Sequence, residues 1–191
     1  MRAVKKRKRT AYDDPSLNKL AMVIGHLCIK WAWIEETLDT FIGNYAPLAE
    51  GHIQHAITSN LDIKNKIQIL KALAFERSQS DKWFDDVSRL LNIVDNELRP
   101  ERNKYVHGVW HTRVEGKLHR TSLRISFKKA QAFQPVSLTT KEQIRVNLRD
   151  AQRFCGRVER VFIDLFIVLC TPPERGGPVL AAKPSGTAEQ D

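Results

Sequence analysis

A long seven-residue repeat of apolar side chains constrains the fold of this chain more than any other sequence feature. It begins after Asp14 and Pro15, an N-cap residue followed by proline at the first helical position, and it continues to about Asn44. Its apolar residues alternate between spacings of three and four, which predicts one helix of that length with a single buried stripe. The stripe consists of Leu17, Leu20, Ile24, Leu27, Trp31, Ile34, Leu38 and Phe41.

A second repeat of the same kind lies near the C-terminus. Thr140 with Gln143, or Thr139 with Glu142, forms a capping box, so we expect the last helix to begin there. Two long helices with such stripes pack side by side at a small angle, as in a helical bundle. The second stripe consists of Ile144, Leu148, Ala151, Cys155, Val158, Phe162, Leu165 and Leu169.

Shorter helices are predicted between the two repeats. Apolar spacing predicts one helix over residues 61–75. Ser80 predicts the cap of another, whose apolar stripe runs from Trp83 to Leu98. Pro100 interrupts this helix, so we expect the chain to kink or restart there.

The apolar period changes to two after Gly108, which predicts a β-hairpin. It covers residues 109–127, with the turn at Glu115 and Gly116. We therefore expect a mainly all-α fold: a four- to five-helix bundle with two long helices and a small β-hairpin inserted before the last helix.

The positive charge of the chain is concentrated at its beginning. The net charge is +9, and the first ten residues hold six lysines and arginines with no acidic residue. We expect residues 1–13 to form a disordered basic arm. Such arms attract nucleic-acid phosphates, and they are also common as solubilising tails. Prolines, glycines and small residues predict a flexible tail over 171–191, which leaves 14–170 as one helical domain.

The sequence predicts a cytoplasmic protein that does not bind a membrane. The most apolar run, residues 161–170, is short and contains Asp164, so it does not fit a membrane span. The N-terminus lacks the apolar segment of a secretory signal. Cys28, Cys155 and Cys170 are odd in number and lie in apolar helical patterns, so we expect buried, free thiols.

The segment Arg102–Gly108 combines a permanent cation, an amide and an imidazole. Asn103 and His107 are four residues apart and share one helix face. The long side chain of Arg102 can reach the same place from one position to the side. Because an arginine can hold a phosphate and a histidine can move a proton, the segment predicts phosphodiester chemistry. The same spacing also fits an exposed helix end, where a histidine interacts favourably with the helix dipole.

Other chemistries have less support. The sequence has no glycine-rich phosphate loop, no GxSxG motif and no Cys-x-x-Cys pair. His52 and His55 could share a metal ion, but no third ligand has suitable spacing, so we expect no metal and no cofactor. Arg113 and His119 also match the arginine–histidine spacing, across the predicted hairpin, and we interpret that match as accidental.

The sequence Arg-Asn-x-x-x-His at 102–107 resembles the motif of the higher-eukaryote-and-prokaryote nucleotide-binding (HEPN) superfamily. The long first and last helices, with the motif late in a middle helix, are also similar to that family. The resemblance covers about residues 15–170 and depends on this one short motif. Many members are metal-independent endoribonucleases that act as toxins, phage-defence effectors or RNA-processing factors, and others are non-catalytic. A hairpin directly after the motif departs from the family's simplest pattern.

The resemblance implies a homodimer in which two motifs face one cleft. His107 would take the proton from an RNA 2′-hydroxyl or give one to the leaving 5′-oxygen. Arg102 would stabilise the charge of the phosphorane-like transition state, and Asn103 would orient the phosphate or the imidazole. The products would be a 2′,3′-cyclic phosphate and a 5′-hydroxyl.

Three interpretations follow from the sequence. The first is a dimeric, metal-independent endoribonuclease of the toxin or phage-defence type, in which Lys104, Tyr105 and Trp110 bind the RNA substrate beside the motif. An antitoxin or another protein could be its partner. The second is a non-catalytic module that binds nucleic acid, nucleotide or protein. The third is a helical oligomerisation protein, because the apolar repeats explain most of the chain without chemistry.

Overall fold

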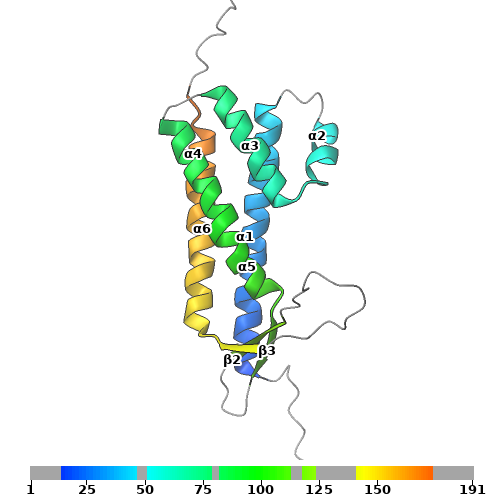
Figure 1. The fold of residues 1–191 in the computed structure, drawn as a ribbon, viewed down its shortest axis with the longest axis vertical. Helices are drawn as coiled ribbons and strands as arrows, with labels where there is room; N and C mark the ends of the chain where they lie inside the picture. The colour runs from blue at the N-terminus through cyan, green and yellow to red at the C-terminus, as the bar shows by residue number, and fades with distance from the viewer. Residues whose placement is uncertain (1–13, 47–50, 79–81, 113–117, 124–140, 174–191) are drawn as a thin grey trace, which may run out of the picture.

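The computed structural model describes residues 14–46, 51–78, 82–112, 118–123 and 141–173. These residues form a mainly helical bundle with a small β-sheet at one end (Figure 1), which confirms the predicted fold class. The basic arm and most of the C-terminal tail lie outside the described residues. The elements are α1 (Pro15–Tyr45), α2 (Gly51–Thr58), α3 (Ile63–Arg77), α4 (Lys82–Ile93), the π-helix η2 (Val94–Leu98), α5 (Arg99–Val106), β1 (Val109–Thr112), β2 (Leu118–Leu123), β3 (Lys141–Arg145) and α6 (Leu148–Cys170).

Helices α1 and α6 form the central pair, as their matching repeats predict. The carboxylate of Asp14 caps α1 by accepting hydrogen bonds from the backbone N–H groups of its first turn. Near the middle, Lys30 Nζ lies 2.7 Å from Glu159 Oε2, and further on the Tyr45 hydroxyl donates to the Leu169 carbonyl at 2.7 Å. The second contact lies further along both helices than the first, so α1 and α6 run in the same direction (Figure 1).

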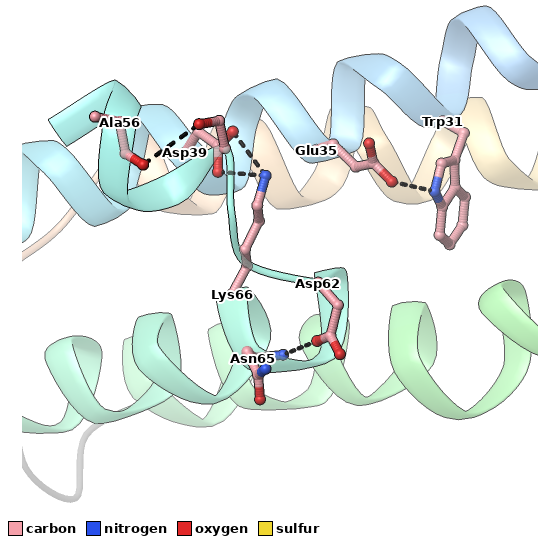
Figure 2. A network of polar contacts seen from close by, with 8 residues as sticks. Trp31, Glu35, Asp39, Ala56, Asp62, Asn65 and Lys66 are labelled. Atoms are coloured by element: carbon pink, nitrogen blue, oxygen red, sulfur yellow. Dashed lines mark hydrogen bonds and ion pairs between the residues drawn. The ribbon is translucent and has the colours of Figure 1, made fainter. Parts of the chain in front are cut away.

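Helices α3 and α4 cover one side of this pair. Trp83 Nε1 on α4 donates to the Val168 carbonyl of α6 at 2.8 Å. A buried ion pair joins α3 to α1, because Lys66 Nζ lies 2.7 Å from the carboxylate of Asp39 and their side chains are 8% and 17% exposed (Figure 2). The core between the layers includes Ile34, Leu38, Ile67, Leu70, Val87, Leu91, Val94, Leu98, Val158, Leu165 and Leu169.

The predicted interruption near Pro100 takes the form of one wide helical turn. Regular α-helix ends at Ile93, and the backbone N–H of Arg99 bonds to the carbonyl of Val94, five residues back. Proline has no N–H and its ring crowds the preceding turn, so a widened turn before it lets the helical path continue. The path therefore runs on into α5, which carries Arg102–His107.

The predicted hairpin is present and belongs to a three-stranded sheet. β1 pairs antiparallel with β2, with Trp110 opposite Arg120, and β3 pairs antiparallel with the other edge of β2. The predicted turn at Glu115 and Gly116 and the part of the predicted hairpin beyond Leu123 lie outside the described residues. The structure brings this sheet to the end of the bundle where α5 ends and α6 begins (Figure 1).

The predicted start of the last helix is wrong. Residues 141–145 form β3, and α6 begins at Leu148, where the side chain of Asn147 accepts from the Arg149 backbone N–H at 3.0 Å. Ile144 fits the spacing of the apolar repeat, but its segment gains main-chain hydrogen bonds from β2 instead. Pairing between distant strands overrides a local pattern of this kind.

Other sequence expectations have mixed outcomes. Helix α2 was not expected. The three cysteines are free, and Cys155 is buried, but Cys28 is half-buried and Cys170 is exposed at the last residue of α6. The expectation that all three are buried is therefore wrong. In the part of the chain that the structure describes, no helix is long and apolar enough to cross a membrane.

Candidate functional site

Helix α5 turns one side to the core and presents Asn103 and His107 on the other. Tyr105 is only 6% exposed. Asn103 and His107 stand two residues before and after it, about 200° away around a helix. They therefore share the outer face, as the sequence predicts, and both line one groove. His107 ends the helix and is exposed.

The groove lies between the end of α5 and the strands that follow. Its volume is about 350 Å³. Helix α5 supplies one wall and strands β1 and β2 supply the other, so residues far apart in sequence meet there. The lining residues are Pro100, Asn103, Lys104, His107, Gly108, Val109, Arg120 and Thr121.

Arg102 lies beside the groove and is not among the residues that line it. Its Nη1 donates to Asn103 Oδ1 at 3.1 Å, and its guanidinium carbon lies 5.5 Å from the centre of the Trp31 ring. That ring belongs to the buried face of α1, and its Nε1 donates to Glu35 at 2.8 Å (Figure 2). Because Arg102 occupies the amide oxygen of Asn103, the Nδ2 group remains as that amide's donor for a phosphate.

Tyr105 and Trp110 build the corner between α5 and β1. Their rings stack 5.8 Å apart, and the Tyr105 ring also stacks on Phe154 at 5.4 Å. Trp110 Nε1 donates to the Tyr105 carbonyl at 2.9 Å. Burial raises the pKa of Tyr105, the charges of Glu101 and Asp150 add to this effect, and the positive charge of Arg120 opposes it. The structure thus places Tyr105 in the core and not on the groove, and Trp110 is half-buried against it.

Lys104 is the exposed cation of α5. Its Nζ lies 2.6 Å from Glu101 Oε2, one turn back on the same helix, and both side chains are more than a third exposed. Solvent screens such a pair, so it contributes at most about 1 kcal/mol and a polyanion can replace it. Lys104 is therefore placed to contact a ligand at the rim of the groove.

Gly108 and Arg120 make a contact that only a residue without a side chain allows. A Cβ at position 108 would lie 2.7 Å from the Lys104 carbonyl oxygen and 2.8 Å from Arg120 Cδ. The sequence did not single out Arg120. Gly108 and the change to a period of two were its only signals, because the partner of a strand is not visible in the strand itself.

The described residues contain no group of three or more histidine, cysteine or acidic side chains placed to hold a metal ion. His55 lies exposed on α2, and the side chain of His52 is outside the described residues. Comparisons with protein-family models, with curated proteins and with solved structures each find no match to this chain.

The groove combines a proton carrier with anion-binding groups. His107 is exposed at the mouth, the Asn103 amide lies one turn away, and Lys104 and Arg120 supply positive charge. Imidazole transfers protons near neutral pH, and guanidinium binds phosphate through paired N–H donors. The arrangement therefore suits a phosphodiester better than a neutral or cationic ligand.

Proposed function

We propose that this protein is a metal-independent endoribonuclease that binds RNA in the groove beside α5. The observation that carries the proposal is the presence of His107, Asn103 and Arg120 on one groove. The arginine–histidine motif, with its resemblance to the HEPN superfamily, gives the reaction class. The fold is also compatible, since the motif lies late in a middle helix of a mainly α bundle.

In the proposed reaction His107 acts at a 2′-hydroxyl. It takes the proton from O2′, which attacks the adjacent phosphorus, or it gives a proton to the departing O5′. The P–O5′ bond breaks as the P–O2′ bond forms, so the products are a 2′,3′-cyclic phosphate and a 5′-hydroxyl. Asn103 donates from Nδ2 to a phosphate oxygen. Arg102 stabilises the transition state by fixing that amide and by adding positive charge beside it.

The proposal includes a homodimer, which the resemblance implies. Support for a dimer, but not for one in which two motifs share a cleft, comes from an apolar patch on the side of α1 and α6 that α3 and α4 do not cover. Trp33 of this patch lies about 200° around α1 from Trp31, against which Arg102 lies, so a dimer through the patch leaves each groove on an outer face. The rings of Trp33, Phe162 and Phe166 follow one another at 5.6 and 6.2 Å. Exposed members of the patch are Ile29, Trp33, Ile163, Phe166 and Ile167.

The size of this patch fits a second copy of the chain. Each of its five exposed side chains is about half exposed, which leaves about 100 Å² each. The total, on the order of 500 Å², is a large part of the ~800 Å² that each partner buries in a standard interface. The largest apolar patch of a typical monomer is about 300–600 Å² and often marks an interaction site, so an area of this size is compatible with an interface.

For the biological role, we propose a cytoplasmic toxin or phage-defence ribonuclease with RNA as its substrate. The support is the resemblance together with the basic first ten residues, which would add electrostatic attraction to RNA. A protein partner such as an antitoxin would hold the enzyme inactive until a trigger releases it.

RNA cleavage in the presence of EDTA tests the proposed function. We expect the unmodified protein to cleave single-stranded RNA, and Arg102→Ala and His107→Ala to lose at least a hundredfold in rate. His26→Ala is the matched control, because His26 is exposed on α1 and does not line the groove. Equal cleavage by all variants would indicate another site or a contaminant. RNA binding without cleavage would replace the enzyme by a non-catalytic binding module.

A further inference from the structure

Arg120 reaches the groove from β2, and its position is fixed by two contacts. In the sheet it pairs with Trp110, which ties it to the corner of β1 and α5. Its aliphatic stem then crosses the end of α5, so close that a Cβ on Gly108 would lie 2.8 Å from Cδ and 2.9 Å from Cγ. The side chain therefore lines the same groove as His107 and Asn103.

The guanidinium of Arg120 is more available to a ligand than the other two cations beside the groove. Lys104 is paired with Glu101, and Arg102 donates to Asn103 and lies over Trp31. Among the residues that the structure describes, no carboxylate or carbonyl accepts a hydrogen bond from the guanidinium of Arg120. Its guanidinium is also near enough to Tyr105 to lower the pKa of that phenol against the larger effect of burial.

We infer that Arg120 is the residue that binds the scissile phosphate, and that Arg102 is a positioning residue that acts through Asn103. The inference rests on the proposed function, since it assigns a phosphate of RNA to this groove. It also means that one chain supplies imidazole, amide and guanidinium together. A guanidinium is suited to this task because its paired N–H donors match two phosphate oxygens.

The test measures binding of a 2′-O-methyl oligoribonucleotide, which cannot undergo attack by O2′. We expect Arg120→Gln to weaken binding about tenfold and to reduce the slope of log affinity against log salt by about 0.7, the value for one phosphate contact of a single strand. Arg89→Gln is the matched control, because Arg89 is an exposed arginine on α4 outside the groove. We expect it to change binding by less than about twofold.

Two further variants test the paired N–H donors of Arg120 and the positioning role of Arg102. Arg120→Lys keeps a positive charge and a stem that can cross Gly108, but it loses the paired donors, so we expect a loss of about threefold. If Arg120→Gln fails to fold, the binding measured for Arg120→Lys tests the inference instead. Arg102→Gln should change the affinity little but lower the cleavage rate, because its effect passes through Asn103.

The outcomes distinguish this inference from the proposed function. If unmodified protein binds but does not cleave natural RNA, and Arg120→Gln still weakens binding selectively, the enzyme proposal fails and the inference holds. If RNA is cleaved and Arg120→Gln binds and cleaves like Arg89→Gln, the inference is overturned and the enzyme stands. No binding of the oligonucleotide by unmodified protein overturns the inference as well.

Discussion

Replacing Gly108 by alanine tests whether the end of α5 depends on the absence of a side chain. The added Cβ would lie 2.7 Å from the Lys104 carbonyl oxygen, whereas ordinary contact begins at 3.4 Å. The end of α5 or the start of β1 must therefore move by about 0.7 Å. Backbone cannot rotate away as a side chain can, and the Arg120 stem blocks the other direction.

The expected cost follows from this clash. Overpacking by one methyl group destabilises a protein by about 1–3 kcal/mol, and in a chain of 191 residues 1 kcal/mol lowers Tm by about 2–4 °C. We expect Gly108→Ala to lower Tm by about 6 °C. Gly25→Ala is the matched control, because Gly25 lies inside α1 and no atom lies within 4 Å of the position that its new methyl group would take. It should raise the free energy of unfolding by about 0.5–1 kcal/mol.

Thermal unfolding followed by far-ultraviolet circular dichroism measures both variants. The predicted result is a change of opposite sign for the same substitution, and Gly108→Ala should also bind the 2′-O-methyl oligonucleotide more weakly because Arg120 is displaced. If Gly108→Ala were as stable as the unmodified protein, the close approach of Arg120 and α5 would be refuted.

Three further predictions concern the bundle. Lys66→Met should lower the free energy of unfolding, measured by urea denaturation, by about 3 kcal/mol, because it breaks the ion pair between the buried Lys66 ammonium and the Asp39 carboxylate; an additional Asp39→Leu should restore most of the loss. Burial raises the pKa of Tyr45 to about 12, and the charge of Arg77 opposes this rise. The stabilisation that comes from keeping this phenol neutral in the folded protein is on the order of 2 kcal/mol. It is full below about pH 10 and is lost as the pH rises toward 12. Tyr45→Phe should flatten this pH dependence in Tm measurements. Trp33→Glu should convert a dimer to a monomer in sedimentation velocity, and an unchanged sedimentation coefficient would contradict the proposed interface.

The helical part of the fold was predictable because its information is local. The Asp14 cap, the stripe of α1 and most of the stripe of α6 depend on residues three or four apart, and the structure buries most of them as expected. The third strand was not predictable in this way. Its segment follows the same apolar spacing through Ile144, and only its pairing with β2 decides between strand and helix.

The candidate site was likewise predictable only where its residues are close in sequence. That Asn103 and His107 share one face follows from helix geometry, and the structure places both on the groove. The environment of Tyr105 and the approach of Arg120 depend on how α5, β1 and β2 meet, which no local period encodes. Gly108 belongs to both groups: the sequence shows that the helical pattern ends there, but only the structure shows its close contact with Arg120.

The most direct test of the proposed chemistry is whether cleavage needs the 2′-hydroxyl and His107. An RNA oligonucleotide that the protein cleaves in EDTA is compared with the same oligonucleotide carrying one 2′-deoxynucleotide on the 5′ side of the cleaved bond. We predict that cleavage at that bond disappears, that the unmodified RNA yields 2′,3′-cyclic phosphate and 5′-hydroxyl ends, and that His107→Ala, but not His26→Ala, abolishes the reaction. Cleavage of the deoxy-substituted bond at an unchanged rate, or products with 5′-phosphate ends, would contradict the proposed attack by the 2′-hydroxyl.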